Sequence, residues 1–139
     1  MAAIDIDWAL CGTRHSIARY RPLLMVFQIL LFIAGSLFWL DARTSDNAFS
    51  TSVYGEFALQ YPAELWAGAM MGFSTITWLG LIKPIRKTMI AVGAIGNAVQ
   101  FMLLSYSAVF TGGEFVIGIF ASLLFLTPHV WLSIEAVIE

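Results

Sequence analysis

Two long apolar segments joined by a short basic turn constrain this chain more than any other feature. Residues 63–82 and 88–110 contain one acidic residue and no basic residue, whereas the turn between them, KPIRK at 83–87, holds three of the seven Lys and Arg residues. At about 1.5 Å per helical residue, each segment is long enough to cross a hydrocarbon core about 30 Å thick. The pattern predicts a transmembrane helical hairpin.

The composition extends this prediction to the whole chain. Of 139 residues, 60% are hydrophobic and 12% are charged, and the mean hydropathy is +0.84. A typical soluble domain has about 25% charged residues. A chain of this length also has too little interior to hide so much apolar surface from water. We therefore expect a membrane protein and not a soluble globule.

Two further segments complete the predicted set of spans. Residues 22–40 and 115–134 contain no Asp, Glu, Lys or Arg. The polar residues 41–62 between the first two spans form an external loop, and residues 1–21 form either a short amphipathic helix at the interface or a disordered cytoplasmic tail. We expect residues 1–139 to be a single membrane domain.

The basic residues orient these spans. With four alternating spans, six of the seven fall on one side of the membrane, which the excess of Lys and Arg identifies as the cytoplasm. These topology anchors are Arg14, Arg19, Arg21, Lys83, Arg86 and Lys87. The predicted fold is all-α and polytopic, with four transmembrane helices in an antiparallel bundle, both termini cytoplasmic, in the cytoplasmic (inner) membrane. Residues 1–20 lack the apolar run of a signal peptide, so the first span is expected to act as the insertion signal.

Glycines in the second and third spans are candidates for helix packing. Gly68 and Gly72 lie one turn apart on one helix face, a spacing that allows a second helix to approach closely. Gly93 and Gly96 provide similar small positions in the third span. The spacing leaves open whether these glycines serve packing within one monomer or association between copies.

Three amides inside the spans are the strongest polar candidates. We expect Gln28, Asn97 and Gln100 to face other helices, because an unpaired amide facing lipid is costly. Such amides usually bond across helices, although Asn97 and Gln100 also suit a ligand site or a water-filled path. Three hydroxyl side chains of the second span are expected to bond carbonyls of their own helix and need no other partner: Ser74, Thr75 and Thr77.

Titratable groups are almost absent from the spans, which argues against a proton relay or a proton-coupled transporter. The exception is His129, which follows Pro128 in the fourth span. Its imidazole suits a hydrogen bond inside the bundle, and a weaker reading makes it a ligand for haem or a metal. We interpret His129 as structural first and as a cofactor-binding candidate second, and we predict no metal and no cofactor.

Several classes of function are disfavoured by what the chain contains. A single cysteine, Cys11, excludes an intramolecular disulfide and a cysteine-based metal cluster. A net charge of −2 gives no basis for binding nucleic acid. The sequence has no phosphate loop, metal-ligand cluster or nucleophile with a base, so we expect no enzyme activity.

The order of these features resembles a known type of protein. The segment YPAELWAGAMMG, the basic turn IKPIRK and the third span with AIGNAVQFML look like parts of the small four-helix membrane proteins, often called holin-like, of tailed bacteriophages and prophages. The resemblance spans about residues 22–135 and rests on architecture and on positions such as Trp66, Gly72 and Arg86. Many holins have one to three spans, so four spans depart from that pattern.

The resemblance implies a non-enzymatic protein that works by helix packing and self-association in the lipid bilayer, as a homo-oligomer. One alternative is an accessory subunit of a larger respiratory or photosynthetic membrane complex. A third reading, a small-solute transporter, is disfavoured by the lack of charge within the spans.

Overall fold

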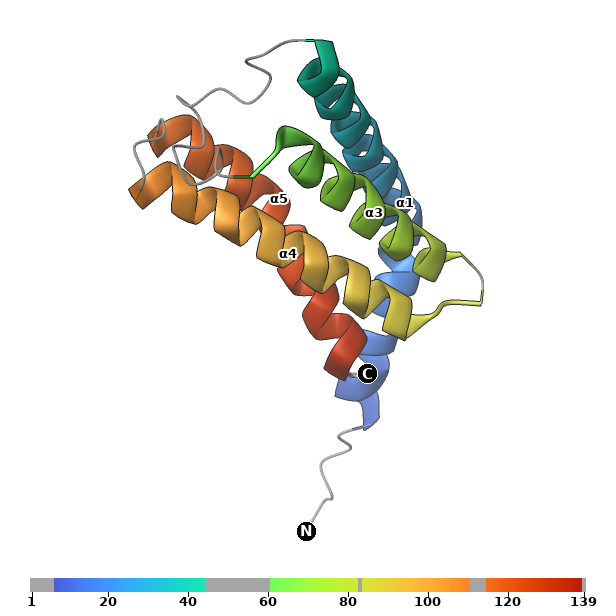
Figure 1. The fold of residues 1–139 in the computed structure, drawn as a ribbon. Coiled ribbons are helices and arrows are strands. Elements are labelled where there is room, and N and C mark those ends of the chain that lie inside the picture. The colour runs from blue at the N-terminus through green and yellow to red at the C-terminus, as the bar shows by residue number, and fades with distance from the viewer. Residues whose placement is uncertain (1–6, 45–60, 83, 111–114, 139) are drawn as a thin grey trace.

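A computed structural model describes residues 7–44, 61–82, 84–110 and 115–138, and within these ranges the chain is all-α with no strand. The helices are α1 (Asp7–Thr44), α3 (Ala63–Leu81), α4 (Lys87–Phe110) and α5 (Phe115–Ile138). Successive helices run in opposite directions, and the start of α1 and the end of α5 lie at the same end of the bundle (Figure 1). Extensive contacts join α1 to α3, α3 to α4 and α4 to α5, whereas α1 and α5 touch only sparingly.

Helix α1 is much longer than the first predicted span. It begins at Asp7, and Pro22 lies inside it and not in its first turn. Pro22 and Ala18 are both exposed, so the Ala18 carbonyl that Pro22 cannot bond lies at the surface, where another partner can reach it. Residues 1–21 were expected to form either a short interfacial helix or a disordered tail. Their described part, 7–21, is helical and continuous with the first span. Most of the predicted external loop, 45–60, lies outside the described residues.

A short turn closes the α3–α4 hairpin. The backbone leaves α3 through Ile82, which has extended torsion angles of −69° and 142° and whose amide donates a hydrogen bond to the Leu79 carbonyl. The Arg86 amide then donates a hydrogen bond of 2.9 Å to the Gly80 carbonyl, which joins the turn to the end of α3. The Ile90 amide donates one of 3.2 Å to the Arg86 carbonyl, which closes the first turn of α4.

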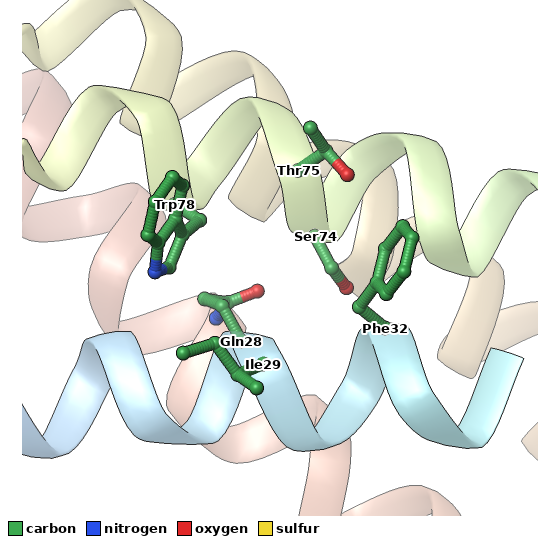
Figure 2. A pocket seen from close by; sticks show the side chains of 6 residues that line it. All are labelled: Gln28, Ile29, Phe32, Ser74, Thr75 and Trp78. Carbon is green, nitrogen blue, oxygen red and sulfur yellow. The ribbon is translucent and has the colours of Figure 1, made fainter. Parts of the chain in front are cut away.

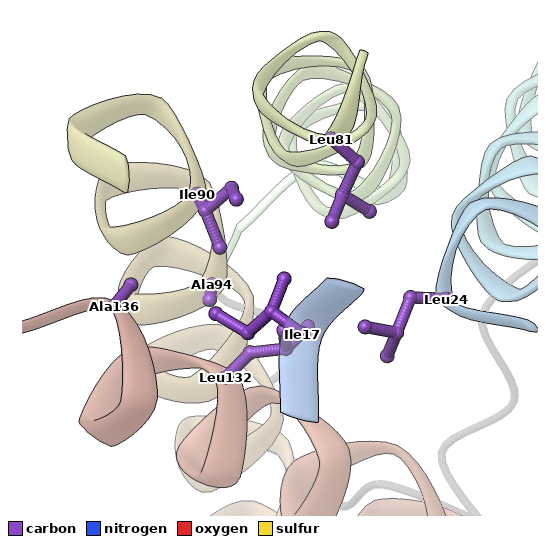
Figure 3. Close-up of a cluster of buried hydrophobic side chains, with 7 residues drawn as sticks. All are labelled: Ile17, Leu24, Leu81, Ile90, Ala94, Leu132 and Ala136. Carbon is purple, nitrogen blue, oxygen red and sulfur yellow. The ribbon is translucent and has the colours of Figure 1, made fainter. Parts of the chain in front are cut away.

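Two apolar clusters fill the interior. The first, at the end that holds both the start of α1 and the end of α5, draws residues from all four helices (Figure 3): Ile17, Leu24, Leu81, Ile90, Ala94, Leu132 and Ala136. The second lies further along the bundle: Leu31, Trp66, Met70, Phe101 and Leu104. Between them the four helices are joined by polar side chains.

Large apolar side chains cover much of the outer surface, and buried polar side chains lie between the two apolar clusters. Leu23 and Leu124 are each 68% exposed, whereas Asn97 and His129 are 0% exposed. By length and hydropathy, two helices contain a segment that could span a membrane: Ile17–Leu40 and Lys87–Phe110, of 24 residues each. Leu123–Ile138 is a shorter apolar helical segment. Among the described residues, these two helices are thus apolar and long enough to cross a membrane.

Candidate functional site

Each helix contributes one polar side chain to the centre of the bundle. We call this group, Gln28 of α1, Ser74 of α3, Asn97 of α4 and His129 of α5, the polar layer. All four residues are buried, none more than 1% exposed. Three hydrogen bonds connect them, so the layer joins all four helices through side chains alone.

His129 is the hub of the polar layer. Its Nδ1 donates a hydrogen bond of 2.6 Å to the Phe125 carbonyl one turn earlier, which places the proton on Nδ1 and leaves Nε2 as an acceptor. Asn97 Nδ2 then donates to Nε2 at 3.1 Å, and Gln28 Nε2 donates to the same nitrogen at 3.4 Å. This pattern is that of the neutral imidazole.

Aromatic rings also lie beside the imidazole. The rings of Phe27 and Phe101 are tilted against the His129 ring at 5.5 Å and 5.8 Å, centroid to centroid. Phe125 in turn stacks on both phenylalanines. Both ring nitrogens therefore have hydrogen-bond partners, and the ring has aromatic neighbours. The arrangement supports the structural interpretation of His129, because a haem or metal would have to displace an existing hydrogen bond.

The layer lies at a fixed register between the two apolar clusters. On α1, Leu24, Gln28 and Leu31 follow one another at spacings of four and three residues, so they lie along one helix face. On α4 the same face carries Ala94 and then Asn97. A slip of either helix by one turn would place its amide inside an apolar cluster. Buried polar groups of this kind are known to specify register in helical assemblies.

Gln100 lies outside the polar layer. It is buried on α4, and its Nε2 donates a hydrogen bond of 2.8 Å to the carbonyl of Trp66 on α3. Asn97 and Gln100 are three residues apart on neighbouring helix faces, so one points to the centre of the bundle and the other to the α3 backbone. Gln28, Asn97 and Gln100 thus all bond across helices, as expected.

The hydroxyl residues of α3 divide into two kinds. Thr75 and Thr77 donate to the Met71 and Phe73 carbonyls of their own helix, at 2.7 Å and 2.9 Å, as expected. Ser74 also has a partner on another helix, because its Oγ accepts a hydrogen bond of 3.4 Å from Asn97 Nδ2. Its position one turn from Met70 on the buried face of α3 is the sequence signal for this role.

The glycines of α4 allow the close approach of α3. A Cβ added at Gly93 would lie 2.7 Å from the Phe73 carbonyl oxygen and 2.7 Å from the Thr77 amide nitrogen. A Cβ at Gly96 would overlap the Phe73 ring. These two glycines therefore serve packing within the monomer.

The pair on α3 behaves differently. A Cβ at Gly68 would meet the Trp39 ring at 3.4 Å, an ordinary contact, and a Cβ at Gly72 would find no atom within 4 Å. The close contact between α1 and α3 depends instead on Gly35, where a Cβ would lie 2.8 Å from Met71 Cγ and 3.1 Å from the Ala67 carbonyl oxygen. Sequence reasoning did not single out Gly35, whose only signal was a glycine inside an apolar span.

The topology anchors that the structure describes lie at the hairpin turn and in the first half of α1. Arg19, Arg86 and Lys87 are exposed and Arg21 is half-buried. Lys83 lies outside the described residues, and Arg14 is described only as part of the α1 helix. Arg19 and Arg21 on α1 and the hairpin turn all belong to the end of the bundle that holds the first apolar cluster.

Metal ligands do not gather in the described part of the chain, where no group of three or more His, Cys, Asp or Glu side chains is placed to hold an ion. The site is therefore a hydrogen-bonded polar layer with one histidine, two amides and a hydroxyl. Comparison of the chain with protein-family models, with curated proteins and with solved structures finds no match.

Proposed function

We propose that the chain is a non-enzymatic protein of the bacterial inner membrane, with four spans and both termini cytoplasmic, that acts by self-association in the manner of holin-like phage proteins. The many large apolar side chains exposed on the outer surface support the membrane placement, because exposed apolar patches of this extent are typical of lipid or protein contact. The exposed Arg86 and Lys87 at the hairpin turn support a cytoplasmic location for that end.

One observation carries the self-association. Leu65, Gly72 and Leu79 repeat at seven-residue intervals on α3, and all three are exposed. A heptad repeat keeps such residues along one side of a helix. At its centre Gly72 has no neighbour within 4 Å of an added Cβ, so no packing inside the monomer requires a glycine there. A small residue between two leucines suits close approach of a second helix.

The amides and the other glycines do not contribute to this proposed interface. Gln28, Asn97 and Gln100 are hydrogen-bonded inside the monomer, and Gly93 and Gly96 pack against α3. The proposed interface is therefore the outward face of α3 around Gly72.

A substitution series at one position tests the proposal. We expect Gly72→Leu to abolish association of labelled copies in lipid vesicles, measured by energy transfer against lipid dilution, and Gly72→Ala to retain it because alanine is still small. On induced expression in bacteria, the native chain and Gly72→Ala should collapse the membrane potential, and Gly72→Leu should not. Equal association of all three chains would refute the assigned interface, and a preserved potential at high membrane content would refute the holin-like activity.

A second experiment addresses the accessory-subunit alternative. If gentle detergent extraction yields a stable complex with other proteins and no homo-oligomer, then the α3 face serves a partner subunit. The variant of this alternative in which His129 holds a pigment or haem has no support from the geometry, because both ring nitrogens are hydrogen-bonded.

A further inference from the structure

A pocket between α1 and α3 adjoins the polar layer. It encloses about 300 Å³, and its lining is shown in Figure 2: Gln28, Ile29, Phe32, Ser74, Thr75 and Trp78. Ile29 and Phe32 are each 45% exposed, so the pocket opens sideways at their edge. Gln28 and Ser74, in contrast, belong to the buried polar layer. The pocket thus leads from the apolar surface to the polar centre.

Two polar atoms of residues that line this pocket are buried and have no partner in the described part of the chain. Gln28 Oε1, an acceptor, and Trp78 Nε1, a donor, make no hydrogen bond within the described part of the chain. Figure 2 shows the indole nitrogen on the edge of Trp78 that faces α1, and the Gln28 amide rising from α1 toward α3. Buried groups of this kind are rare, because burial without a partner costs free energy.

The orientation of the Gln28 amide follows from the polar layer. His129 Nδ1 donates to the Phe125 carbonyl, so Nε2 can only accept. Gln28 therefore turns its NH₂ group toward His129, with 3.4 Å between the two nitrogens. The amide oxygen is left without a partner as a consequence of this bond, so the acceptor is held in place by α5.

We propose that this pocket binds a small apolar molecule that carries one hydroxyl group, of the phenol class. The hydroxyl donates to Gln28 Oε1 and accepts from the Trp78 indole N–H, so that one group satisfies both orphan atoms. The ring of the ligand packs against Ile29, Phe32 and the Trp78 ring. The proposal is independent of self-association, because the pocket lies between α1 and α3 of a single chain.

Size and wall chemistry select this class of ligand. Cavities of about 150 Å³ with apolar walls take up benzene, and ligand pockets begin at about 300 Å³, so a volume of about 300 Å³ suits one or two fused rings. One water molecule could bond both orphan atoms, but it occupies only about 30 Å³ and would leave most of the apolar wall without contact. An aromatic hydroxyl satisfies the polar atoms and the walls together.

Three probes with the same body separate the two hydrogen bonds from partition into lipid. 2-Naphthol both donates and accepts, 2-methoxynaphthalene only accepts, and naphthalene does neither. Their binding is measured by equilibrium dialysis against lipid nanodiscs that contain the native chain, with empty nanodiscs as the blank. We expect 2-naphthol to bind about tenfold more tightly than 2-methoxynaphthalene, the change expected for loss of one buried hydrogen bond.

Variants assign the binding to this pocket. Gln28→Leu removes the acceptor and Trp78→Phe removes the donor while keeping a ring, and each should weaken 2-naphthol binding about tenfold. The matched control is Gln100→Leu, because Gln100 is also a buried glutamine whose Oε1 lacks a partner among the described residues. It lines a different pocket, between α3 and α4, and its loss should leave 2-naphthol binding unchanged.

Three results would overturn the proposal. Equal binding of the three probes beyond the blank would show that the pocket selects only apolar bulk. Unchanged 2-naphthol affinity in Trp78→Phe, which keeps the ring and should fold, would show that the indole N–H is not used. A loss of binding in Gln100→Leu as large as in Gln28→Leu would move the site to the other pocket.

Discussion

The α3–α4 contact makes a quantitative prediction about one methyl group. In Gly93→Ala the new Cβ would lie 2.7 Å from two backbone atoms of α3, whereas ordinary contacts of a Cβ begin at 3.4 Å. The two helix backbones would therefore have to separate by about 0.7 Å, in an interior that is packed at crystal density. Neither atom is the end of a flexible side chain, so the overlap cannot be relieved by a rotamer change.

The size of the effect follows from two opposing terms. Overpacking of this kind destabilises the fold by about 1–3 kcal/mol. Replacing a helical glycine with alanine stabilises the helix by up to about 1 kcal/mol. We expect Gly93→Ala to lower the free energy of unfolding by about 1–2 kcal/mol. The control is Gly72→Ala, which makes the same chemical change in a helix interior but meets no atom within 4 Å.

The assay is unfolding by SDS titration in mixed micelles, followed by far-UV circular dichroism, at a micelle excess that keeps the chain monomeric. Gly72→Ala should be neutral or slightly stabilising, because only the helix-propensity term applies. Since both variants share that term, the difference between them isolates the overpacking. Equal midpoints for the two variants, or stabilisation by Gly93→Ala, would refute the inferred backbone contact between α4 and α3.

Two further predictions concern the buried amides and the topology. Asn97→Leu should lower the free energy of unfolding by about 1–2 kcal/mol, because it removes the shorter of the two hydrogen bonds to His129 Nε2. Gln100→Leu should change it by less than about 0.5 kcal/mol, because the Trp66 carbonyl keeps its own helical bond. The same SDS titration measures both, and equal losses would contradict the central role of Asn97. Green fluorescent protein fused to either end of the chain should fluoresce in bacteria, since both ends are expected in the cytoplasm. Alkaline phosphatase inserted within 41–62 should be active, since this loop is expected to be external. An inactive phosphatase, or a dark fusion at one end, would rule out four spans with both ends inside.

The sequence was sufficient for the helices and for the inward position of the amides. Apolar segments with at most one acidic residue predicted the four described helices, and the cost of an unpaired amide in lipid placed Gln28, Asn97 and Gln100 against other helices. Their partners could not be predicted, because a partner depends on how each helix is rotated about its axis. Ser74 shows the difficulty, since the same side chain can bond its own helix or its neighbour.

Glycine spacing identified a close contact within the monomer on α4 but not on α3. Gly68 and Gly72 have the spacing of a packing motif, yet the close contact of α1 with α3 uses Gly35 on α1 instead. A spacing motif identifies a face of a helix, and it does not say which neighbour that face meets. The length of α1 was also missed, because Pro22 was taken as a helix start although its position near the surface allows it inside the helix.

The polar layer has a consequence for the order of biogenesis. Because each helix supplies one member, Gln28 and Asn97 cannot reach their shared acceptor until α5, the last of the four described helices to be made, delivers His129. Without α5, Gln28 lacks this partner and Asn97 keeps only its bond to Ser74. Insertion of α5 is thus the step that completes the polar layer, and a chain truncated before residue 129 should be a substrate for membrane proteases.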